Sequence, residues 1–331
     1  MPVGGWSKTL ASYRQPKTGR SIFEIVVTVG PLLAIWVLAW ALQAHGWWWA
    51  ALLLTVPAAL FLVRLFMIQH DCGHGSFFGQ RQANDWVGRV IGVFTLTPYD
   101  QWRNTHAVHH ATSGNLDRRG LGAIGMLTVD EYAALPPLRR LGYRLYRHPA
   151  VMFGLGPAYV FFIEQRLPVG MMRQGWRPWA SVLGNGLGVA VGLGGLVWLF
   201  GLAPVLIVNV VTMLLAATIG VWLFYVQHQF ESAVWARSGA WKLDDAALTG
   251  SSHYDLPPVL RWFTANIGIH HVHHLSSRIP FYRLSKVLKD HPELRPVSRV
   301  GLLESFRCAR LALWDEAAGR LVSFREARRA A

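Results

Sequence analysis

The chain has 331 residues, of which 52% are hydrophobic and only 15% are Asp, Glu, Lys or Arg. A soluble globular protein usually carries about 25% charged residues, so this composition argues against an ordinary soluble enzyme and excludes a disordered or collagen-like chain. The charge is one-sided, with 32 Lys and Arg against 18 Asp and Glu, which by itself permits nucleic acid or anionic lipid as a partner.

Two long segments without a charged residue indicate that the chain crosses a membrane. Residues 25–63 and residues 179–230 contain no Asp, Glu, Lys or Arg. A transmembrane helix needs about 20 apolar residues, so each segment accommodates two spans joined by a tight turn. The alternative is a buried hairpin of a soluble protein, but its helices would carry a polar stripe, which these segments lack. We therefore predict four transmembrane helices, at approximately residues 22–45, 47–68, 179–200 and 204–227.

The basic residues predict the side of the membrane on which each remaining part lies. Four of them fall in residues 1–21, twelve in 69–178 and fifteen in 229–331, whereas the two turns hold none. An even number of spans places these three parts on one face, and the positive-inside rule makes that face cytoplasmic. We expect one membrane domain, residues 1–331, with a cap formed by residues 69–178 and 228–331. The arginine surplus then reports topology, and nucleic acid is not expected as a partner.

Three shorter segments are predicted to lie at the membrane surface. Residues 86–99 and 148–163 are apolar but too short to span, as expected for interfacial or re-entrant segments. Residues 302–324 mix apolar side chains and arginines at roughly helical spacing, so we expect this segment to lie along the surface as well.

Histidines gather in three clusters, all in parts of the chain predicted to lie on the cytoplasmic face of the membrane. His70 and His74 stand in the sequence HDCGH, the second cluster is HAVHH at 106–110, and the third is HHVHH at 270–274; His228 directly follows the fourth span. Spacings of three and four residues place side chains on one face of a helix, about 5–6 Å apart at Cβ. A lone histidine is ordinarily a hydrogen-bonded polar residue. Three such clusters on one membrane face instead predict a metal centre.

The ligand chemistry narrows the choice of metal. Imidazole suits zinc, copper, iron and nickel, and a structural zinc site closes with four ligands that usually include cysteine. Nine convergent histidines exceed that number and suffice for two metals. The sequence has no His-Glu-x-x-His motif, so a zinc hydrolase would lack its general base. An all-nitrogen site for two metals at the membrane surface favours iron and oxygen chemistry on a lipid-soluble substrate.

The histidine clusters and their surroundings also carry a family resemblance. The stretches concerned are HDCGHGSF at 70–77, WRNTHAVHHATSGNLD at 102–117, FYVQHQFE at 224–231, GSSHYDLP at 250–257 and NIGIHHVHHLSSRIP at 266–280. They resemble the membrane fatty acid desaturase family, in particular its bacterial and cyanobacterial acyl-lipid branch of Δ12 or ω-3 type. The resemblance covers roughly residues 20–295. It implies an all-α integral membrane bundle of four transmembrane helices, with a cytoplasmic helical cap that holds two iron ions.

The resemblance also implies the site residues. The family's ligands fall on His70, His74, His106, His109, His110, His270, His273 and His274, with His228 as a ninth. His271 is left over as the variable residue of the third cluster. No catalytic residue beyond the ligands is implied. Candidates for orienting the imidazoles or approaching the metals are Asp71, Asp117, Glu231, Asp255 and Asn266.

The implied activity is that of an O2-dependent oxidoreductase which inserts a cis double bond into an acyl chain. The substrate would be an acyl lipid in a bacterial inner membrane. The His-Pro-Gly-Gly haem motif of fused cytochrome b5 domains is absent from the sequence. Electrons would therefore come from a separate donor, a ferredoxin or similar protein with its reductase.

Other functions use similar histidine clusters and remain open at this point. They include a fatty acid or alkane hydroxylase, an alkene-forming decarboxylase, and a carotenoid ketolase or hydroxylase. A histidine-rich metal transporter is disfavoured, because transporters place their ligands at the midplane of broken helices, whereas these clusters lie at or beyond helix ends. The double-bond position and the acyl carrier (glycerolipid, CoA or carrier protein) also stay open, although the resemblance favours glycerolipid.

Overall fold

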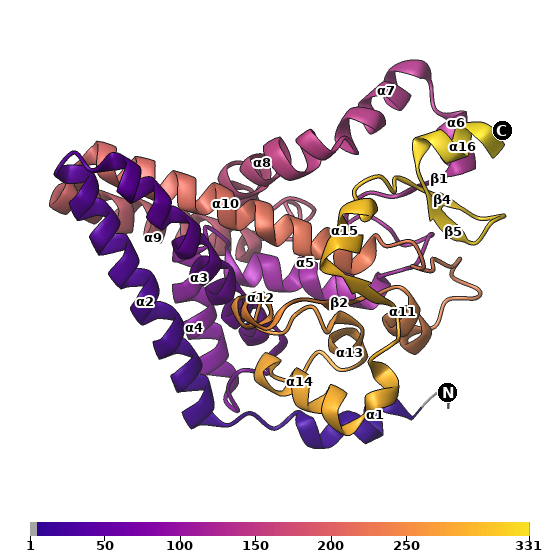
Figure 1. Cartoon of the computed structure of the whole chain (residues 1–331), viewed down its shortest axis with the longest axis horizontal. Helices are drawn as coiled ribbons and strands as arrows, with labels where there is room; N and C mark the ends of the chain where they lie inside the picture. The colour runs from indigo at the N-terminus through magenta and orange to yellow at the C-terminus, as the bar shows by residue number, and fades with distance from the viewer. Residues whose placement is uncertain (1–4, 331) are drawn as a thin grey trace.

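Four long apolar helices dominate the computed structural model, which describes residues 5–330 (Figure 1). They are α2 (Thr18–Ala44), α3 (Trp48–His74), α9 (Trp176–Phe200) and α10 (Leu202–His228), and each is long and apolar enough to cross a membrane. At 1.5 Å per residue, even the shortest of them exceeds the roughly 30 Å of a bilayer's hydrocarbon core. The predicted number and location of the apolar helices are confirmed.

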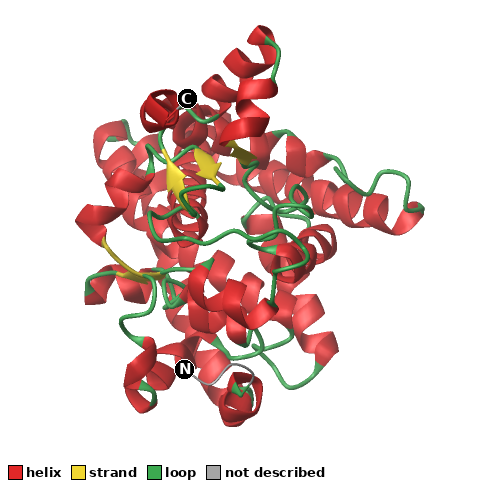
Figure 2. Cartoon of the chain, turned by 90° about the vertical axis from the view of Figure 1, so that its right-hand side faces the viewer, coloured by secondary structure: helices red, strands yellow, loops and turns green. Residues whose placement is uncertain are grey.

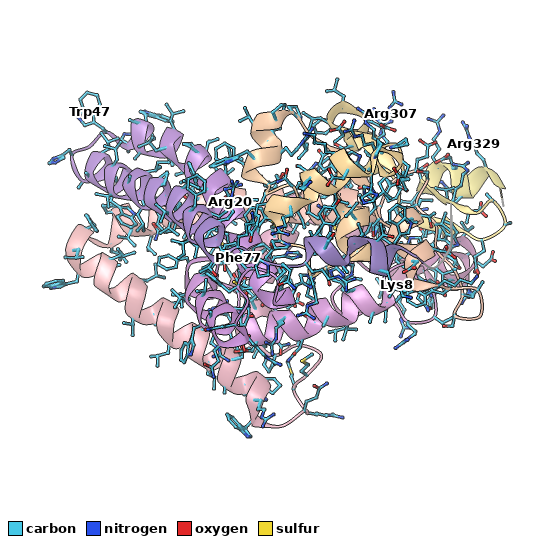
Figure 3. The ribbon with its side chains drawn as sticks, turned by 90° about the horizontal axis from the view of Figure 1, so that it is seen from below. Lys8, Arg20, Trp47, Phe77, Arg307 and Arg329 are labelled. Carbon is cyan, nitrogen blue, oxygen red and sulfur yellow. The ribbon has the colours of Figure 1, made fainter. Side chains whose placement is uncertain are left out.

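The two helix pairs turn at the same end of the molecule. Both turns contain a glycine with positive φ, Gly46 at 83° and Gly201 at 84°, a backbone conformation that disfavours other residues. These turns lie together on the left of Figure 1, whereas both ends of the chain lie on the right. Figure 3 shows Trp47 of the first turn at one end and Arg307 and Arg329 at the other. The basic segments therefore gather away from the turns.

The membrane helices continue past the predicted spans at the end opposite the turns. Helix α3 runs on to His74 and stops where Gly75 adopts a φ of 65°. Helix α10 likewise runs on to His228. The first histidine cluster and His228 thus belong to the long helices themselves, with no flexible joint in between.

Two shorter helices follow α3 and lie beside it. Helix α4 (Arg81–Phe94) packs against α3 and α9, and α5 (Tyr99–Thr112) packs against α3, α4 and α9. Trp86, Val90 and Phe94 of α4 are exposed at four-residue spacing, so one apolar face points outward. This exposed face fits the interfacial position predicted for the segment. Residues 148–163 form the π-helical turn η2 (Val151–Leu155) and α8 (Gly156–Phe162), both packed against α10.

The remaining helices are short and make up most of the cap. They are α1 (Trp6–Thr9), η1 (Leu10–Tyr13), α6 (Val129–Ala134), α7 (Pro137–Tyr146), η3 (Glu164–Arg166), α11 (Leu243–Thr249), α12 (Pro258–Phe263), α13 (His270–Leu275), α14 (Phe281–Asp290), η4 (Pro292–Leu294), α15 (Leu302–Cys308) and α16 (Phe324–Ala330).

Short strands depart from the expected all-α class (Figure 2). Strand β4 (Leu313–Asp315) pairs in parallel with β1 (Leu127–Thr128) and antiparallel with β5 (Arg320–Val322). Strand β2 (His253–Asp255) pairs in parallel with β3 (Arg299–Gly301). The fold is therefore mostly helical with two small sheets, rather than purely helical.

The segment 302–324, expected to lie along the membrane surface, has a different conformation. It forms the short helix α15 and then the hairpin of β4 and β5. Leu313 and Val322 of the hairpin are buried in a small second core with Tyr132 of α6 and Ala327 of α16. The hairpin residues are therefore covered by protein, whereas Leu303 and Phe306 of α15 are exposed, so only the first part of the segment presents an apolar surface.

A buried ion pair ties the third histidine cluster's region to the bundle. Glu24 of α2 and Arg64 of α3 are both almost fully buried and hydrogen-bonded to each other. The Arg64 guanidinium also donates to the Trp262 carbonyl and lies 3.9 Å from the centre of the Trp262 ring. Because an unpaired buried charge is costly, this arrangement fixes α12, which precedes the third cluster, against the two helices.

Candidate metal centre

All nine predicted ligands lie in two groups at the histidine-bearing end of the bundle. One ring nitrogen from each member of a group lies within 4.8 Å of those of the others. The first group consists of His70, His74, His106, His110 and His273, and the second of His109, His228, His270 and His274. Within residues 5–330, neither group includes a carboxylate or a cysteine. The structure thus offers two adjacent all-imidazole sites.

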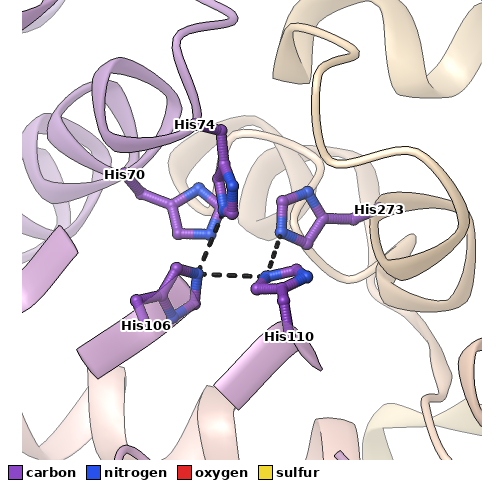
Figure 4. Close-up of side chains that lie close together, drawn as sticks. All are labelled: His70, His74, His106, His110 and His273. Atoms are coloured by element: carbon purple, nitrogen blue, oxygen red, sulfur yellow. Dashed lines mark hydrogen bonds between the residues drawn. The ribbon is translucent and has the colours of Figure 1, made fainter. Parts of the chain in front are cut away.

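Three helices supply the first group (Figure 4). The Nε2 atom of His106 lies 3.1 Å from Nε2 of His74 and 3.2 Å from Nε2 of His110, and the latter lies 3.2 Å from Nε2 of His273. His70 completes the group, with its ring centre 4.6 Å from that of His273. Helices α3, α5 and α13 therefore direct their imidazoles toward one point.

The second group is built around His228 at the end of α10. Its Nε2 atom lies 3.0 Å from the Nε2 atoms of both His109 and His270. Its other ring nitrogen, Nδ1, lies 3.1 Å from the Gly250 carbonyl. A carbonyl only accepts, so Nδ1 carries the proton and Nε2 presents a lone pair to the group. His274 Nε2 lies 3.1 Å from His270 Nε2 and closes the group.

Residue spacing explains how the clusters divide between the groups. The pairs four residues apart, 70/74, 106/110 and 270/274, each stay in one group. The histidine three residues after the first of a pair, His109 or His273, belongs to the other group. Four residues advance a helix by slightly more than one turn and three by slightly less. Each HxxHH cluster therefore contributes histidines to both groups.

The electrostatic surroundings keep these imidazoles neutral. Burial, reinforced by neighbouring imidazoles, holds the pKa values of the histidines on α5 and α13 well below the ordinary histidine value. The histidines concerned are His106, His109, His110, His270, His273 and His274. Neutral imidazole is the form that binds a metal. Several nitrogens converging at about 3 Å cannot all share protons, whereas a cation at their centre satisfies every lone pair.

The two histidine groups are in direct contact with each other. The rings of His110 and His274 stack with centres 4.1 Å apart and an interplanar angle of 15°. The rings of His270 and His273, which belong to different groups, lie 5.3 Å apart. Two cations bound here would be close neighbours, so the residues present fit a centre with two metals.

His271 faces away from both groups. Its Nε2 atom lies 2.9 Å from the Leu294 carbonyl, and its ring lies 5.4 Å from that of His253. His253 is also buried, with Nδ1 2.8 Å from the Arg295 carbonyl. Both histidines therefore anchor the segment after the third cluster, and His271 lies outside the two groups.

The five further candidates occupy different surroundings. Asp71 is buried beside the first group: its carboxylate lies 3.4 Å from His70 Nδ1 and accepts from the Phe281 backbone N–H at 2.7 Å. It therefore joins α3, the first group and α14. Asn266 donates to the Phe281 carbonyl and accepts from Ser285, so its amide bonds to α14.

The other three candidate acids make no hydrogen bond to the nine histidines in the part of the chain that the structure describes. Asp117 binds Arg237 at 2.8 Å and the Ser238 N–H. Asp255 binds Arg261 and Arg299; burial raises its pKa, but the arginines outweigh burial and hold the pKa below the ordinary value. Glu231 is exposed.

Trp102 is a part of the site that sequence reasoning did not single out. Its ring stacks on His106, with centres 4.5 Å apart and an interplanar angle of 17°, and lies 5.7 Å from the ring of His70. A Cβ atom on Gly73 would come within 2.7 Å of the Trp102 ring, so the glycine in HDCGH makes room for it. The available signal was the spacing, since Trp102 precedes His106 by four residues on the same helix face.

Comparison with known proteins identifies the family to which the chain belongs. The family model described as fatty acid desaturase matches residues 46–304, most of the chain and all nine histidines. The chain belongs to the fatty acid desaturase family. A protein of Bacillus subtilis named fatty acid desaturase is 43% identical over 96% of this chain and 90% of its own length.

Two cyanobacterial desaturases of Synechocystis are more distant relatives. The protein named sn-1 acyl-lipid omega-3 desaturase (ferredoxin) is 27% identical over 91% of this chain and 81% of its own length. The sn-1 oleoyl-lipid 12-desaturase is 26% identical over 82% of this chain and 75% of its own length. This desaturase is thus an oxidoreductase of the membrane type, with four apolar helices and histidine groups able to bind metal.

Proposed function

We propose that this desaturase introduces a cis double bond into the acyl chain of a membrane glycerolipid, using O2, two electrons and two iron ions. The observation that carries the proposal is the arrangement of the histidines. Nine ring nitrogens form two adjacent groups, with no carboxylate or cysteine among them, at the end of apolar helices. Such a site is rich in nitrogen ligands and lies next to the layer in which a lipid substrate resides.

Iron bound in the two groups would supply the oxidising power, drawn from O2, that removal of hydrogen from an unactivated methylene requires. We assign the five histidines of the first group and the four of the second as its ligands. The chain's own contribution is position. Gly250 fixes the ring of His228, Asp71 holds α14 against the first group, and α3 and α10 fix the height of both groups relative to the membrane. Correct placement of reacting groups supplies a large part of a catalytic barrier.

The substrate and electron donor of the proposal rest on the relatives' names. The two Synechocystis proteins are named as acting on acyl lipids at the omega-3 position and on oleoyl lipids at position 12, and one name includes ferredoxin. We propose an acyl-lipid substrate, a double bond of Δ12 or ω-3 type, and a ferredoxin or similar donor with its reductase. The Bacillus relative's name gives no position.

The proposal also includes orientation in the bacterial inner membrane. The basic residues outside the spans gather at the histidine-bearing end, which the positive-inside rule places in the cytoplasm. A reporter inserted in the turn at Gly201 should then respond only to periplasmic probes, and reporters at both termini only to cytoplasmic ones. Termini on opposite sides would contradict this orientation.

The deciding experiment is expression in a bacterium whose lipids contain monounsaturated but no polyunsaturated chains, together with a ferredoxin and its reductase. Mass spectrometry after derivatisation of double bonds should reveal a new cis double bond in glycerolipid acyl chains. The His273→Ala variant, inserted equally well in the membrane, is the matched control and should give none. A hydroxylated or shortened product would instead indicate a hydroxylase or decarboxylase, and a change in pigment in a carotenoid-producing host would indicate a ketolase.

A further inference from the structure

A cavity of about 810 Å³ opens between α4, the start of α5 and the start of α9. None of the nine histidines lines it. Its volume lies in the range typical of pockets for small ligands, roughly 300–1,000 Å³. Its lining includes Trp86 and Trp176, which are 66% and 73% exposed, so the cavity opens to the outside of the bundle. It is a separate site from the metal centre.

The lining carries more positive than negative charge. It includes Arg89, Arg103 and Arg177, but only one acidic residue, Asp100. Arg89 binds Asp100 at 2.9 Å, and Arg103 binds Asp85 at 2.7 Å. Each guanidinium has five N–H donors, so both arginines keep donors for a further partner. Among residues 5–330, Arg177 has no acidic side chain within ion-pairing distance and is exposed at the mouth.

Gln101 of the lining is held in place by neighbouring segments. Gln101 is only 5% exposed; its Nε2 donates to the Val169 carbonyl at 3.1 Å, and its backbone N–H donates to Ser181. These contacts tie the start of α5 to residues 169–181, which border the cavity.

The surfaces on either side of the cavity suit acyl chains. On α9, Leu183, Leu187 and Val191 are exposed at four-residue spacing, continuing from the cavity along the apolar helix. On α4, the exposed Val90 lies next to Trp86 by the same spacing. Tryptophan is enriched where a bilayer meets water. The cavity therefore lies at headgroup level, and the apolar stripe on α9 leads from it into the hydrocarbon layer.

We propose that this cavity binds the head group of an anionic glycerophospholipid. The phosphodiester accepts hydrogen bonds from the arginines, and the acyl chains lie along α9. Phosphatidylglycerol has this combination of groups. The bound lipid joins α4, α5 and α9 and thereby steadies the helix that supplies three of the histidines. This role differs from that of the substrate and needs no turnover.

The test measures lipid retained by the purified full-length protein in detergent. Native mass spectrometry should detect phosphatidylglycerol on the wild type, and its apparent dissociation constant should rise roughly tenfold in Arg177→Gln, as expected for the loss of one charge-assisted hydrogen bond. Arg173→Gln is the matched control, because Arg173 is exposed in the same segment but does not line the cavity. Ala180→Leu, which narrows the cavity without changing its charge, should also lower retention.

Thermal unfolding distinguishes the sources of the phosphate. Phosphatidylglycerol should raise the melting temperature of the wild type more than phosphatidylcholine or inorganic phosphate does, and Arg177→Gln should lose that difference. Equal retention by Arg177→Gln and Arg173→Gln would overturn the proposal. Equal stabilisation by inorganic phosphate would reduce the site to a simple anion site, and equal stabilisation by phosphatidylcholine would reduce it to a non-selective lipid contact; either result overturns it as well. None of these outcomes bears on whether the protein desaturates lipids.

Discussion

The two histidine groups differ in number and in enclosure. The first has five imidazoles, and three of them, His74, His106 and His110, are only partly buried. The second has four, all buried, and one of them, His228, is held by the Gly250 carbonyl. A cavity of about 20 Å³, lined by His109 and His228 among others, lies beside the second group and has room for about one water molecule. With iron bound as proposed, the first group would offer one nitrogen more than the second, and the second would have a small cavity beside it.

The largest expected effect follows from that difference. His228→Gln leaves three nitrogens in the second group, so iron content should fall from about two to about one per chain and double-bond formation should be lost. Metal analysis of purified protein together with lipid product analysis measures both. His271→Gln is the control, since His271 bonds to the Leu294 carbonyl, and it should keep its iron. Full iron and near-normal turnover in His228→Gln would leave eight ligands.

Loss of one member of the first group should be milder for the metal. His74→Ala leaves four nitrogens, so we expect activity to be lost but more than one iron per chain to remain after mild chelation. The iron content of His228→Gln, purified and chelated under the same conditions, is the reference for comparison. If both variants lose iron equally, the fifth nitrogen is not in excess and the two groups are equivalent.

Trp102 provides a way to disturb the first group without removing a ligand. Trp102→Leu removes the ring that stacks on His106, so the imidazole loses its fixed orientation. Partners around a metal ligand typically change affinity by about 10- to 100-fold. We expect a shift of that size in iron dissociation from the first group, measured by competition with a chelator. Trp198→Leu, at a position 85% exposed on α9, should leave iron binding unchanged.

The smallest effect concerns the second core, remote from both groups. Thr128 accepts from the Glu131 N–H and begins α6. Thr128→Ala should lower the free energy of unfolding by about 1 kcal/mol, the usual value for such a cap, and leave iron content unchanged. Chemical denaturation and metal analysis check the two parts. Loss of iron in this variant would show that the β4–β5 hairpin supports the metal centre directly.

Much of this organisation was predictable because it depends on patterns that local physics dictates. Uninterrupted apolar stretches required four long helices, and the spacing within the clusters brought His106 and His110 to one helix face. The same spacing is consistent with a division into two groups. Only the structure shows that His109 and His273 belong to a different group from the histidine pair of their own cluster. Strands of two or three residues, such as β1, leave no periodic signal. Their pairing depends on contacts such as Leu127 with Leu313, far apart in the chain.

Asp117 and Asp255 illustrate why neighbouring residues could not be assigned by motif alone. Both lie in stretches that resemble the family, yet arginines distant in sequence, Arg237 and Arg299, bind their carboxylates. Asp71, by contrast, is buried beside His70 and, within residues 5–330, is not paired with an arginine. The partner of an acidic side chain is decided by tertiary packing, which a single sequence does not display.

Because both histidine groups draw on α13, the order of synthesis matters for the centre. Residues 70–110 and 228 leave the ribosome long before residues 270–274, so neither site can close while the nascent chain is still inserting its helices. Iron bound as proposed would therefore be acquired after translation is nearly complete, by a chain already inserted in the membrane. A truncation before α13 is expected to yield an inserted protein that holds no iron, because its six remaining histidines lack His270, His273 and His274.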